Sequence, residues 1–313
     1  MLTVEPVRIV VVGAGHLGTY HLEKLAADDA AELIGVVEID AERRDRAATD
    51  HGMEGATELS TFRDRAEAAV IATPTTTHLE LAVAALDLGM HVLVEKPIAA
   101  TVDEALRLEG LAADCGLVVQ VGHTERFNPA VTAALAIADR PRYVVAERLA
   151  PFSGRSTDID VILDLMIHDL DIVASIIPSA LTEVRAIGVP VLTQAVDMAS
   201  ARLEFADGSV AQLSAGRASM EPARKIRLFT MERYLSIDCA SGDVKSVRRL
   251  PPEPGSSWPQ IVGEPVEVPE GDALALQDHD FLVCIRESRA PRVDARAGRR
   301  ALELAVAVID ALR

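Results

Sequence analysis

Three side chains of the 313-residue chain have the types and spacing that proton transfer requires. Asp164 and His168 are four residues apart, so on a helix both side chains would share one face. Histidine titrates near neutral pH, which suits removal of a proton from an alcohol, and Asp164 would hold either the histidine or the substrate. Lys96, within Glu95-Lys96-Pro97, follows an apolar run and would polarise a hydroxyl or orient a substrate. We expect Lys96, Asp164 and His168 to be catalytic.

A glycine motif, Gly13-Ala-Gly15-His-Leu-Gly18, follows an apolar run and opens a predicted helix at residues 17–27. Gly13 permits a tight turn, Gly15 lets the backbone approach a pyrophosphate, and Gly18 lets helix and strand pack closely. The N–H groups at the start of the helix favour the phosphates. The motif therefore predicts a dinucleotide site. Its predicted cofactor-binding residues are Gly13, Gly15, His16, Leu17 and Gly18.

Glu38 ends the second apolar run, about 20 residues after Gly18. A carboxylate at this place accepts hydrogen bonds from the ribose hydroxyls and repels a 2′-phosphate. We therefore predict NAD as the cofactor and include Glu38 in its site. Arg43 and Arg44 follow closely and could accommodate a 2′-phosphate, so the choice between NAD and NADP stays open.

Two further segments follow predicted strands in the same half of the chain. Residues 73–78, Thr-Pro-Thr-Thr-Thr-His, follow the apolar run 69–72, and Glu95-Lys96-Pro97 follows the run 91–94. A ligand of an open parallel sheet lies beyond the carboxyl ends of its strands, so both segments should border the nicotinamide. The predicted cofactor-binding residues of these segments are Thr73, Pro74, Thr75, His78, Glu95 and Lys96. His21, His51, His91 and His279 are most simply structural or exposed.

Apolar runs rich in Val and Ile alternate with helical patterns over the first part of the chain. The runs span 8–12, 33–37, 69–72, 91–94 and 117–121. They contain few polar residues, which is typical of strands buried on both faces in a parallel sheet. Thr101-Val-Asp-Glu104 matches a capping box, and Gly89 and Gly116 stand where helices should end. Residues 1–121 are therefore predicted to be an N-terminal α/β domain with a doubly wound parallel sheet.

The alternation of apolar runs and helical patterns ends after residue 121, which predicts a second domain over 122–313. Helices are expected from Asn128-Pro129, over 160–177, and near 272–288 and 298–312. Strand-like runs lie at 199–205, 209–215, 225–231 and 234–238, with Asp207-Gly208 as a hairpin turn. Consecutive hairpins indicate an α+β domain with an open, mainly antiparallel sheet.

The charge and composition of the chain argue against several classes of binding partner. The net charge of −17 should repel nucleic acid and anionic lipid, so an anionic ligand would need a local basic pocket. No apolar run approaches the ~18–20 residues that cross a bilayer, and Met1–Arg8 do not resemble a signal peptide. The three cysteines are isolated, and no spacing matches a metal site. We expect a cytoplasmic protein without nucleic-acid, membrane or metal partners.

Four motifs in order give the chain a family resemblance: the glycine motif, residues 72–78, Glu95-Lys96-Pro97, and Asp164-Leu-Met-Ile-His168. The chain resembles the glucose-fructose oxidoreductase, inositol dehydrogenase and rhizopine catabolism (Gfo/Idh/MocA) family over nearly its whole length. The resemblance implies a Rossmann domain that binds NAD(P) and a C-terminal sheet domain that often forms dimers or tetramers. It also implies that Lys96 is the catalytic lysine, His168 the acid/base and Asp164 its partner. Met166 replaces the glycine usual in this motif.

A narrower resemblance concerns the segments 122–129, 151–155 and 163–169. They are similar to those of dehydrogenases that oxidise the 3-hydroxyl of UDP-N-acetylglucosamine for the synthesis of 3-amino sugars of lipid A. A UDP-sugar carries a diphosphate, which arginine forks bind well. The predicted substrate-binding residues are Arg126, Asn128, Arg148 and Arg155.

Three alternatives remain beside a nucleotide-sugar dehydrogenase. One is an NAD-dependent glycosidase, in which a transient 3-ketone promotes elimination and NAD is recycled without net NADH. A dehydrogenase of a free sugar or an inositol-type polyol would use the same cofactor and the same acid–base residues. A dinucleotide-binding regulator without turnover would be expected to lose Lys96 or His168, and both are present.

Overall fold

The computed structural model describes residues 5–154 and 159–312, and its contacts divide the chain into two units. The first unit comprises Met1–Thr124 with Asp272–Arg299, and the second comprises Glu125–Gly271 with Arg300–Arg313. The sequence predicts that all residues after 121 belong to the second domain, whereas these contacts group residues 272–299 with the first. The reason is packing, because Phe281 and Leu282 belong to the apolar core of the first unit.

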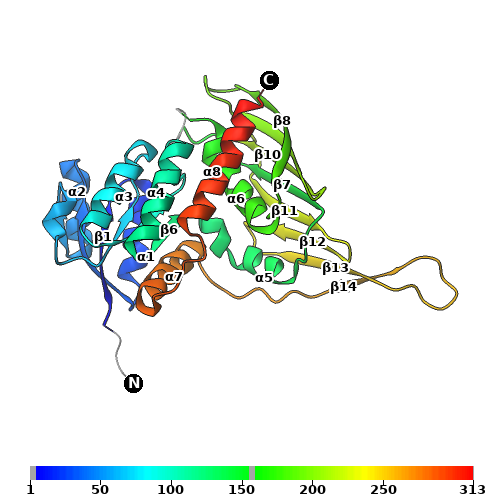
Figure 1. The fold of residues 1–313 in the computed structure, drawn as a ribbon, viewed down its shortest axis with the longest axis horizontal. Coiled ribbons are helices and arrows are strands. Elements are labelled where there is room, and N and C mark those ends of the chain that lie inside the picture. Colours follow the sequence, from blue (N-terminus) through cyan, green and yellow to red (C-terminus); the bar gives the residue numbers. More distant parts are fainter. Residues whose placement is uncertain (1–4, 155–158, 313) are drawn as a thin grey trace. The chain divides into compact units, whose positions relative to one another are not determined.

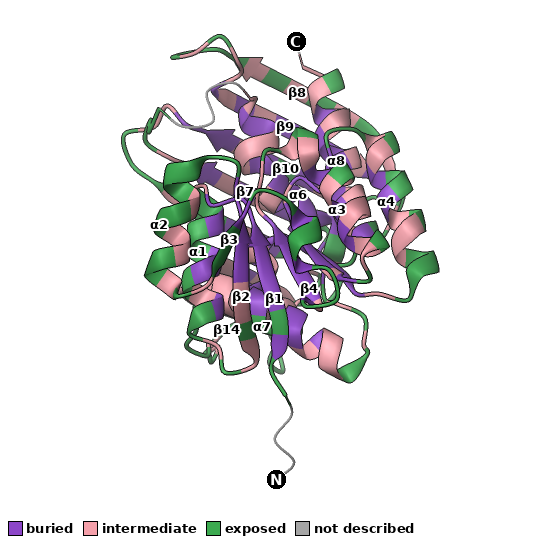
Figure 2. Cartoon of the chain, turned by 90° about the vertical axis from the view of Figure 1, so that its left-hand side faces the viewer, coloured by how far each residue is buried: buried purple, intermediate pink, exposed green. Residues whose placement is uncertain are grey.

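The first unit is built on a six-stranded, wholly parallel sheet with the order β3-β2-β1-β4-β5-β6. This is the strand order of the Rossmann fold, with its topological switch point between β1 and β4. Figure 2 shows β1 and β4 mostly buried, as the apolar runs predict. The strands are β1 (Val7–Val12), β2 (Ala31–Val37), β3 (Glu54–Ala56), β4 (Ala68–Ile71), β5 (His91–Glu95) and β6 (Val119–Gly122).

Helices cover this sheet, and their ends follow the signals in the sequence. Thr101 caps α4 by accepting a hydrogen bond from the Glu104 N–H, while Glu104 accepts one from Ala100. Gly116 ends the same helix in the left-handed conformation with φ of 69°. The helices are α1 (His16–Ala26), α2 (Ala41–His51), α3 (His78–Asp87), α4 (Val102–Cys115) and α7 (Ala273–Glu287), with short 3₁₀ turns η1 (Leu59–Phe62), η2 (Thr75–Thr77) and η3 (Thr124–Phe127).

The second unit is built on an eight-stranded sheet with the order β14-β13-β12-β11-β7-β10-β9-β8. All neighbouring strands are antiparallel except β7 and β10, so the predicted α+β class is confirmed. The strands are β7 (Tyr143–Leu149), β8 (Leu181–Val189), β9 (Met198–Phe205), β10 (Val210–Gly216), β11 (Ala223–Phe229), β12 (Arg233–Asp238), β13 (Val244–Leu250) and β14 (Gln260–Glu264).

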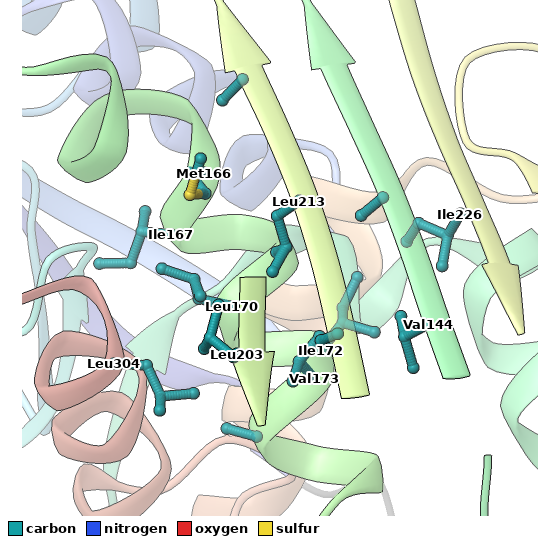
Figure 3. Packing of buried hydrophobic residues seen from close by; sticks show 14 of the residues in the cluster. Val144, Met166, Ile167, Leu170, Ile172, Val173, Leu203, Leu213, Ile226 and Leu304 are labelled. Atoms are coloured by element: carbon teal, nitrogen blue, oxygen red, sulfur yellow. The ribbon is translucent and has the colours of Figure 1, made fainter. Parts of the chain in front are cut away.

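Helices of the second unit contribute to the core beside its sheet (Figure 1). They are α5 (Pro129–Ile137), the π-helical turn η4 (Ile162–Met166), α6 (Ile167–Ile176) and the part of α8 (Ala295–Asp310) from Arg300 onward. Met166 and Leu170 pack with Leu203, Leu213 and Leu304, as Figure 3 shows, and the first four have at most 1% of their surface exposed. This core fixes η4 and α6, which carry Asp164 and His168.

No helix within residues 5–154 and 159–312 is long and apolar enough to span a membrane.

Candidate active site

The glycine motif forms a turn in which Gly13 and Gly18 each have a separate steric reason. Gly13 has φ of 97°, and a Cβ there would lie 2.6 Å from the Ala72 carbonyl oxygen. A Cβ on Gly18 would lie 1.8 Å from the Gly13 oxygen, so only glycine permits this approach of helix and strand. A Cβ on Gly15 would meet nothing within 4 Å, so this side of the turn is open for a ligand.

The start of α1 beside this turn has no side-chain cap, because Gly15 occupies the cap position. Its first N–H groups can therefore bond to phosphate oxygens, as in other dinucleotide sites. His16 stacks edge-on against Tyr20 with 4.7 Å between ring centroids, and Leu17 is exposed. The residues fit a pyrophosphate held by backbone groups rather than by the His16 imidazole.

Glu38 lies just past β2 and is buried next to the glycine turn. Its Oε2 accepts the Ala14 N–H at 2.8 Å, and its Oε1 accepts the Asp40 N–H at 2.9 Å and Arg43 Nη2 at 3.1 Å. Burial alone would raise the pKa of Glu38, but these donors outweigh it and hold the pKa below its ordinary value. The carboxylate is thus ionised and fits the role of ribose acceptor.

The loops after β4 and β5 are joined by His78. Its Nδ1 lies 2.8 Å from the Pro97 carbonyl oxygen and its Nε2 lies 2.9 Å from that of Thr73. The Thr73 and Thr77 hydroxyls share a hydrogen bond of 2.8 Å, which closes the first loop. Burial lowers the pKa of His78. The structure therefore brings the Thr73 loop and the Lys96 turn together, and the His78 side chain links them by hydrogen bonds to both.

Asp164 and His168 lie in consecutive elements of the second unit. Asp164 is in η4, where the Ile167 N–H donates to the Ile162 carbonyl, and His168 is in the first turn of α6. Both residues are half-buried, while Met166 and Ile167 are fully buried. The sequence predicts a regular helix here, and the structure has a π turn instead, an irregularity frequent at functional sites.

Arg148 is buried among carboxylates of its own unit. Its Nε and Nη2 bond to the two Asp169 oxygens at 3.1 and 2.8 Å, and its Nη1 bonds to Glu125 at 2.8 Å. Burial would lower the pKa of Arg148, but these carboxylates outweigh it and raise that pKa above its ordinary value. Each nitrogen of the guanidinium predicted to bind substrate thus bonds to a carboxylate of the protein.

The other predicted substrate residues differ in their surroundings. Asn128 caps α5 by accepting the Ala130 N–H, and it donates to the Cys239 carbonyl at 3.0 Å. Arg126 pairs with Asp171 at 3.3 Å and keeps part of its side chain exposed. Arg155 lies outside the described residues.

The first unit also contains a buried cluster of ionisable side chains that the sequence does not predict. His21 is completely buried between Glu95 and Asp278. Asp278 belongs to no motif, and 257 residues separate it from His21, so no local pattern signals this pair.

Comparisons with known proteins agree with this geometry. A family model described as the oxidoreductase family with an NAD-binding Rossmann fold matches residues 7–123, and the Gfo/Idh/MocA C-terminal domain model matches residues 140–239. The chain belongs to the Gfo/Idh/MocA family. The first unit of this family member is thus an NAD-binding Rossmann domain of an oxidoreductase.

Several relatives of this Gfo/Idh/MocA protein have known names. UDP-N-acetylglucosamine 3-dehydrogenase of Acidithiobacillus ferrooxidans is 39% identical over 306 residues, which is 96% of each chain. A crystal form of that enzyme gives a TM-score of 0.90 over 97% of both chains. The scyllo-inositol 2-dehydrogenase of Bacillus subtilis is 27% identical over 98% of this chain and 94% of that protein. A scyllo-inositol dehydrogenase from Lactobacillus casei, 21% identical, shares the fold with a TM-score of 0.81 over 98% of this chain and 97% of that one.

Proposed function

We propose that the protein oxidises the 3-hydroxyl of UDP-N-acetylglucosamine to a ketone with NAD. The observation that carries this proposal is the 39% identity, over 96% of both chains, with the Acidithiobacillus 3-dehydrogenase. Lys96, Asp164 and His168 support it, since an oxidoreductase acting on an alcohol needs an acid–base pair and a cation at the hydroxyl. Such a ketone suits conversion by an aminotransferase to a 3-amino sugar for lipid A.

The proposed roles divide the chemistry among the cofactor, Lys96, Asp164 and His168. NAD held at the glycine turn and Glu38 would supply the hydride acceptor for the sugar carbon. His168 takes the hydroxyl proton, and Asp164 orients His168 or the sugar. Lys96 donates a hydrogen bond to the same oxygen, which stabilises the negative charge that grows there as the proton leaves.

Recognition of the diphosphate requires local cations in a protein of net charge −17. Arg126 keeps part of its side chain exposed, and Arg155 belongs to the same predicted set. Arg148 and Asn128 are engaged by Asp169, Glu125 and the start of α5, so we assign them to support the site rather than to contact the sugar nucleotide.

We also propose that the protein is a homo-oligomer, a dimer or tetramer, and that it acts in the cytoplasm. The oligomer would use the face of the second sheet that carries the aromatic side chains Tyr143, Phe229 and Tyr234. A cytoplasmic place agrees with the proposed use of free NAD and a nucleotide sugar.

The direct test is to mix the purified protein with NAD and UDP-N-acetylglucosamine and to follow NADH absorbance. A sugar aminotransferase with glutamate removes the ketone and pulls the reaction forward. We expect NADH formation, and its loss in Lys96→Met and His168→Ala. Lys245→Met and His279→Gln are matched controls on exposed side chains and should keep full activity.

Two outcomes would contradict this assignment. If NAD binds and scyllo-inositol alone yields NADH, the substrate is a free polyol. If NAD binds and neither substrate yields NADH, the proposed activity is wrong and a binding role without turnover becomes the better hypothesis.

The cofactor preference has its own test at Glu38. Removing its carboxylate in Glu38→Ala should raise the Kd for NAD about 10-fold or more, since charged hydrogen bonds contribute about 1.5–3 kcal/mol. The same variant should bind NADP relatively better, because the 2′-phosphate is no longer repelled. Titration calorimetry with both cofactors measures this, and Glu42→Ala on the exposed side of α2 is the control. Equal affinities of Glu38→Ala and wild type for both cofactors would place the ribose elsewhere.

A further inference from the structure

A chain of three ionisable groups, Asp278, His21 and Glu95, lies inside the first unit and ends at the residue before Lys96. His21, in the middle of α1, places Nδ1 at 2.9 and 3.0 Å from the two oxygens of Asp278 on α7. Its Nε2 lies 3.1 Å from Glu95 Oε1 at the end of β5. Both ring nitrogens face carboxylates, which are acceptors, so the geometry is that of an imidazolium with two donors.

The electrostatics agree with this geometry. Burial alone would lower the pKa of His21, but Asp278 and Glu95 outweigh it and raise that pKa to about 10. Burial works against ionisation of Glu95 as well, yet the charges of His21 and Lys96 hold the pKa of Glu95 below its ordinary value. Burial, reinforced by the nearby Glu95 charge, raises the pKa of Asp278 in spite of His21.

Glu95 connects this chain to the candidate catalytic lysine. Its Oε1 faces His21, and its Oε2 accepts the backbone N–H of Lys96 at 3.2 Å. The carboxylate is also pressed against β6, where a Cβ on Gly122 would lie 2.3 Å from Oε1. One side chain, fixed on both sides, thus links His21 to the backbone from which the Lys96 side chain starts.

Stability alone is a poor reason for this arrangement. Replacing buried ion pairs by well-packed apolar residues is often neutral or stabilising, and in some proteins buried charges are retained because they define geometry. The network joins the helix that begins at the glycine turn to the turn that carries Lys96. We propose that His21 and Asp278 are positioning residues, which act through Glu95 to hold Lys96 in place for catalysis. This inference rests on the proposed function.

The kinetic test uses His21→Gln and Asp278→Asn. A small displacement of a catalytic group is costly, so we expect kcat to fall about 10- to 100-fold while the KM for the sugar nucleotide and the Kd for NAD stay near wild type. Asp278→Asn keeps a hydrogen-bond acceptor for His21 and is the variant expected to fold best. His279→Gln is the matched control, because His279 neighbours Asp278 and pairs with Asp28 at 2.8 Å on the surface. An unchanged kcat in folded Asp278→Asn would overturn the proposal.

A second readout does not depend on the sugar. In protein labelled with ¹⁵N-histidine, both ring nitrogens of His21 should carry protons well above the ordinary pKa of histidine, about 6.5. Glu95→Gln should remove this signature, and His279→Gln should leave it intact. A His21 ring that titrates like an ordinary histidine would overturn the network. If wild type makes no NADH from any sugar while His21 keeps the imidazolium signature, the proposed function fails and the network stands.

Discussion

The side chain of Arg148 has every guanidinium nitrogen group paired with Asp169 or Glu125 inside the protein. A single sequence cannot distinguish such an arginine from one that binds a phosphate, because the carboxylates that pair with it are brought together only by the fold. The hydrogen-bond partners of Arg148 distinguish the two roles, because both carboxylates would be left buried without a cation if the guanidinium turned to a ligand. Its contribution is therefore expected in folding rather than in substrate affinity.

We predict that Arg148→Leu lowers the free energy of unfolding by about 3–5 kcal/mol, since removing one partner leaves buried charges uncompensated. Urea denaturation followed by circular dichroism measures the loss. Arg185→Leu is the control, because the exposed Arg185–Glu183 pair should contribute at most about 1 kcal/mol. A stable Arg148→Leu with a raised KM for the sugar nucleotide would return Arg148 to the substrate site.

His21 predicts a pH dependence of stability. Its pKa rises from 6.5 to about 10 on folding, so the folded state holds this proton more tightly than the unfolded chain. The stabilisation is complete below pH 6.5 and is lost as the pH rises to about 10. Relative to His21→Gln, the wild type should lose at most about 1.4 kcal/mol per pH unit in that window. Urea titrations of both proteins across the window measure the difference, and a constant difference would contradict the prediction.

At the scale of elements, predictability follows the burial pattern of each strand. Five of the six parallel strands are predicted because apolar residues fill most of both faces, whereas the short, largely exposed β3 is missed. In contrast, β7 places the charged Arg148 at an inward position beside Val144 and Ala146, and β8 has no fully buried residue, so neither gives a clear apolar pattern. Helix starts at Thr101 and Asn128 are local signals, and the structure confirms both caps.

The cap of α4 gives a prediction at this scale. Thr101→Ala removes the acceptor for the Glu104 N–H and should lower the free energy of unfolding by about 1 kcal/mol. Thr101→Ser keeps a hydroxyl and should stay near wild type. Thermal or urea denaturation measures both variants. Equal losses in Ala and Ser would mean that the methyl group, and not the hydrogen bond, carries the effect.

In the candidate site, too, residues in local motifs are predicted, whereas residues paired across the fold are not. The glycine turn, Glu38 and Lys96 are recognisable because their motifs follow single strands. The Asp278 partner of His21 comes from α7, at the far end of the chain, and only tertiary packing of α7 on α1 brings the two together. Long-range pairs of this kind carry no spacing rule, so a single sequence leaves them undetected.

For the molecule as a whole, charge and apolar surface act against each other. The chain has a net charge of −17, which keeps copies apart, yet Tyr143, Phe229 and Tyr234 form a partly exposed aromatic row across β7, β11 and β12. Ring centroids in this row are 5.7 and 5.0 Å apart. Association of two such rows would bury apolar surface that the monomer leaves in water.

We therefore predict that the wild type is at least a dimer and that Phe229→Glu dissociates it, because a buried carboxylate beside a like-charged copy is strongly unfavourable. Sedimentation velocity measures the mass of each species. Leu106→Glu, on the exposed side of α4 in the first unit, should leave the assembly unchanged. A monomeric wild type would contradict the prediction, and a dimeric Phe229→Glu would place the interface on another surface.

The π turn η4 also limits how the chain can change in length. Its Ile167-to-Ile162 hydrogen bond closes a turn one residue wider than that of an α-helix. Deleting one residue of the turn would let it close as a regular α-helix, in which each residue turns the chain by about 100° about the helix axis. Deleting one between Asp164 and His168 would rotate the acid away from the imidazole by the same angle. The number of residues in this turn thus determines the site as much as the side chains do. In a relative, the loss of one residue here would disturb the site as the loss of the histidine would.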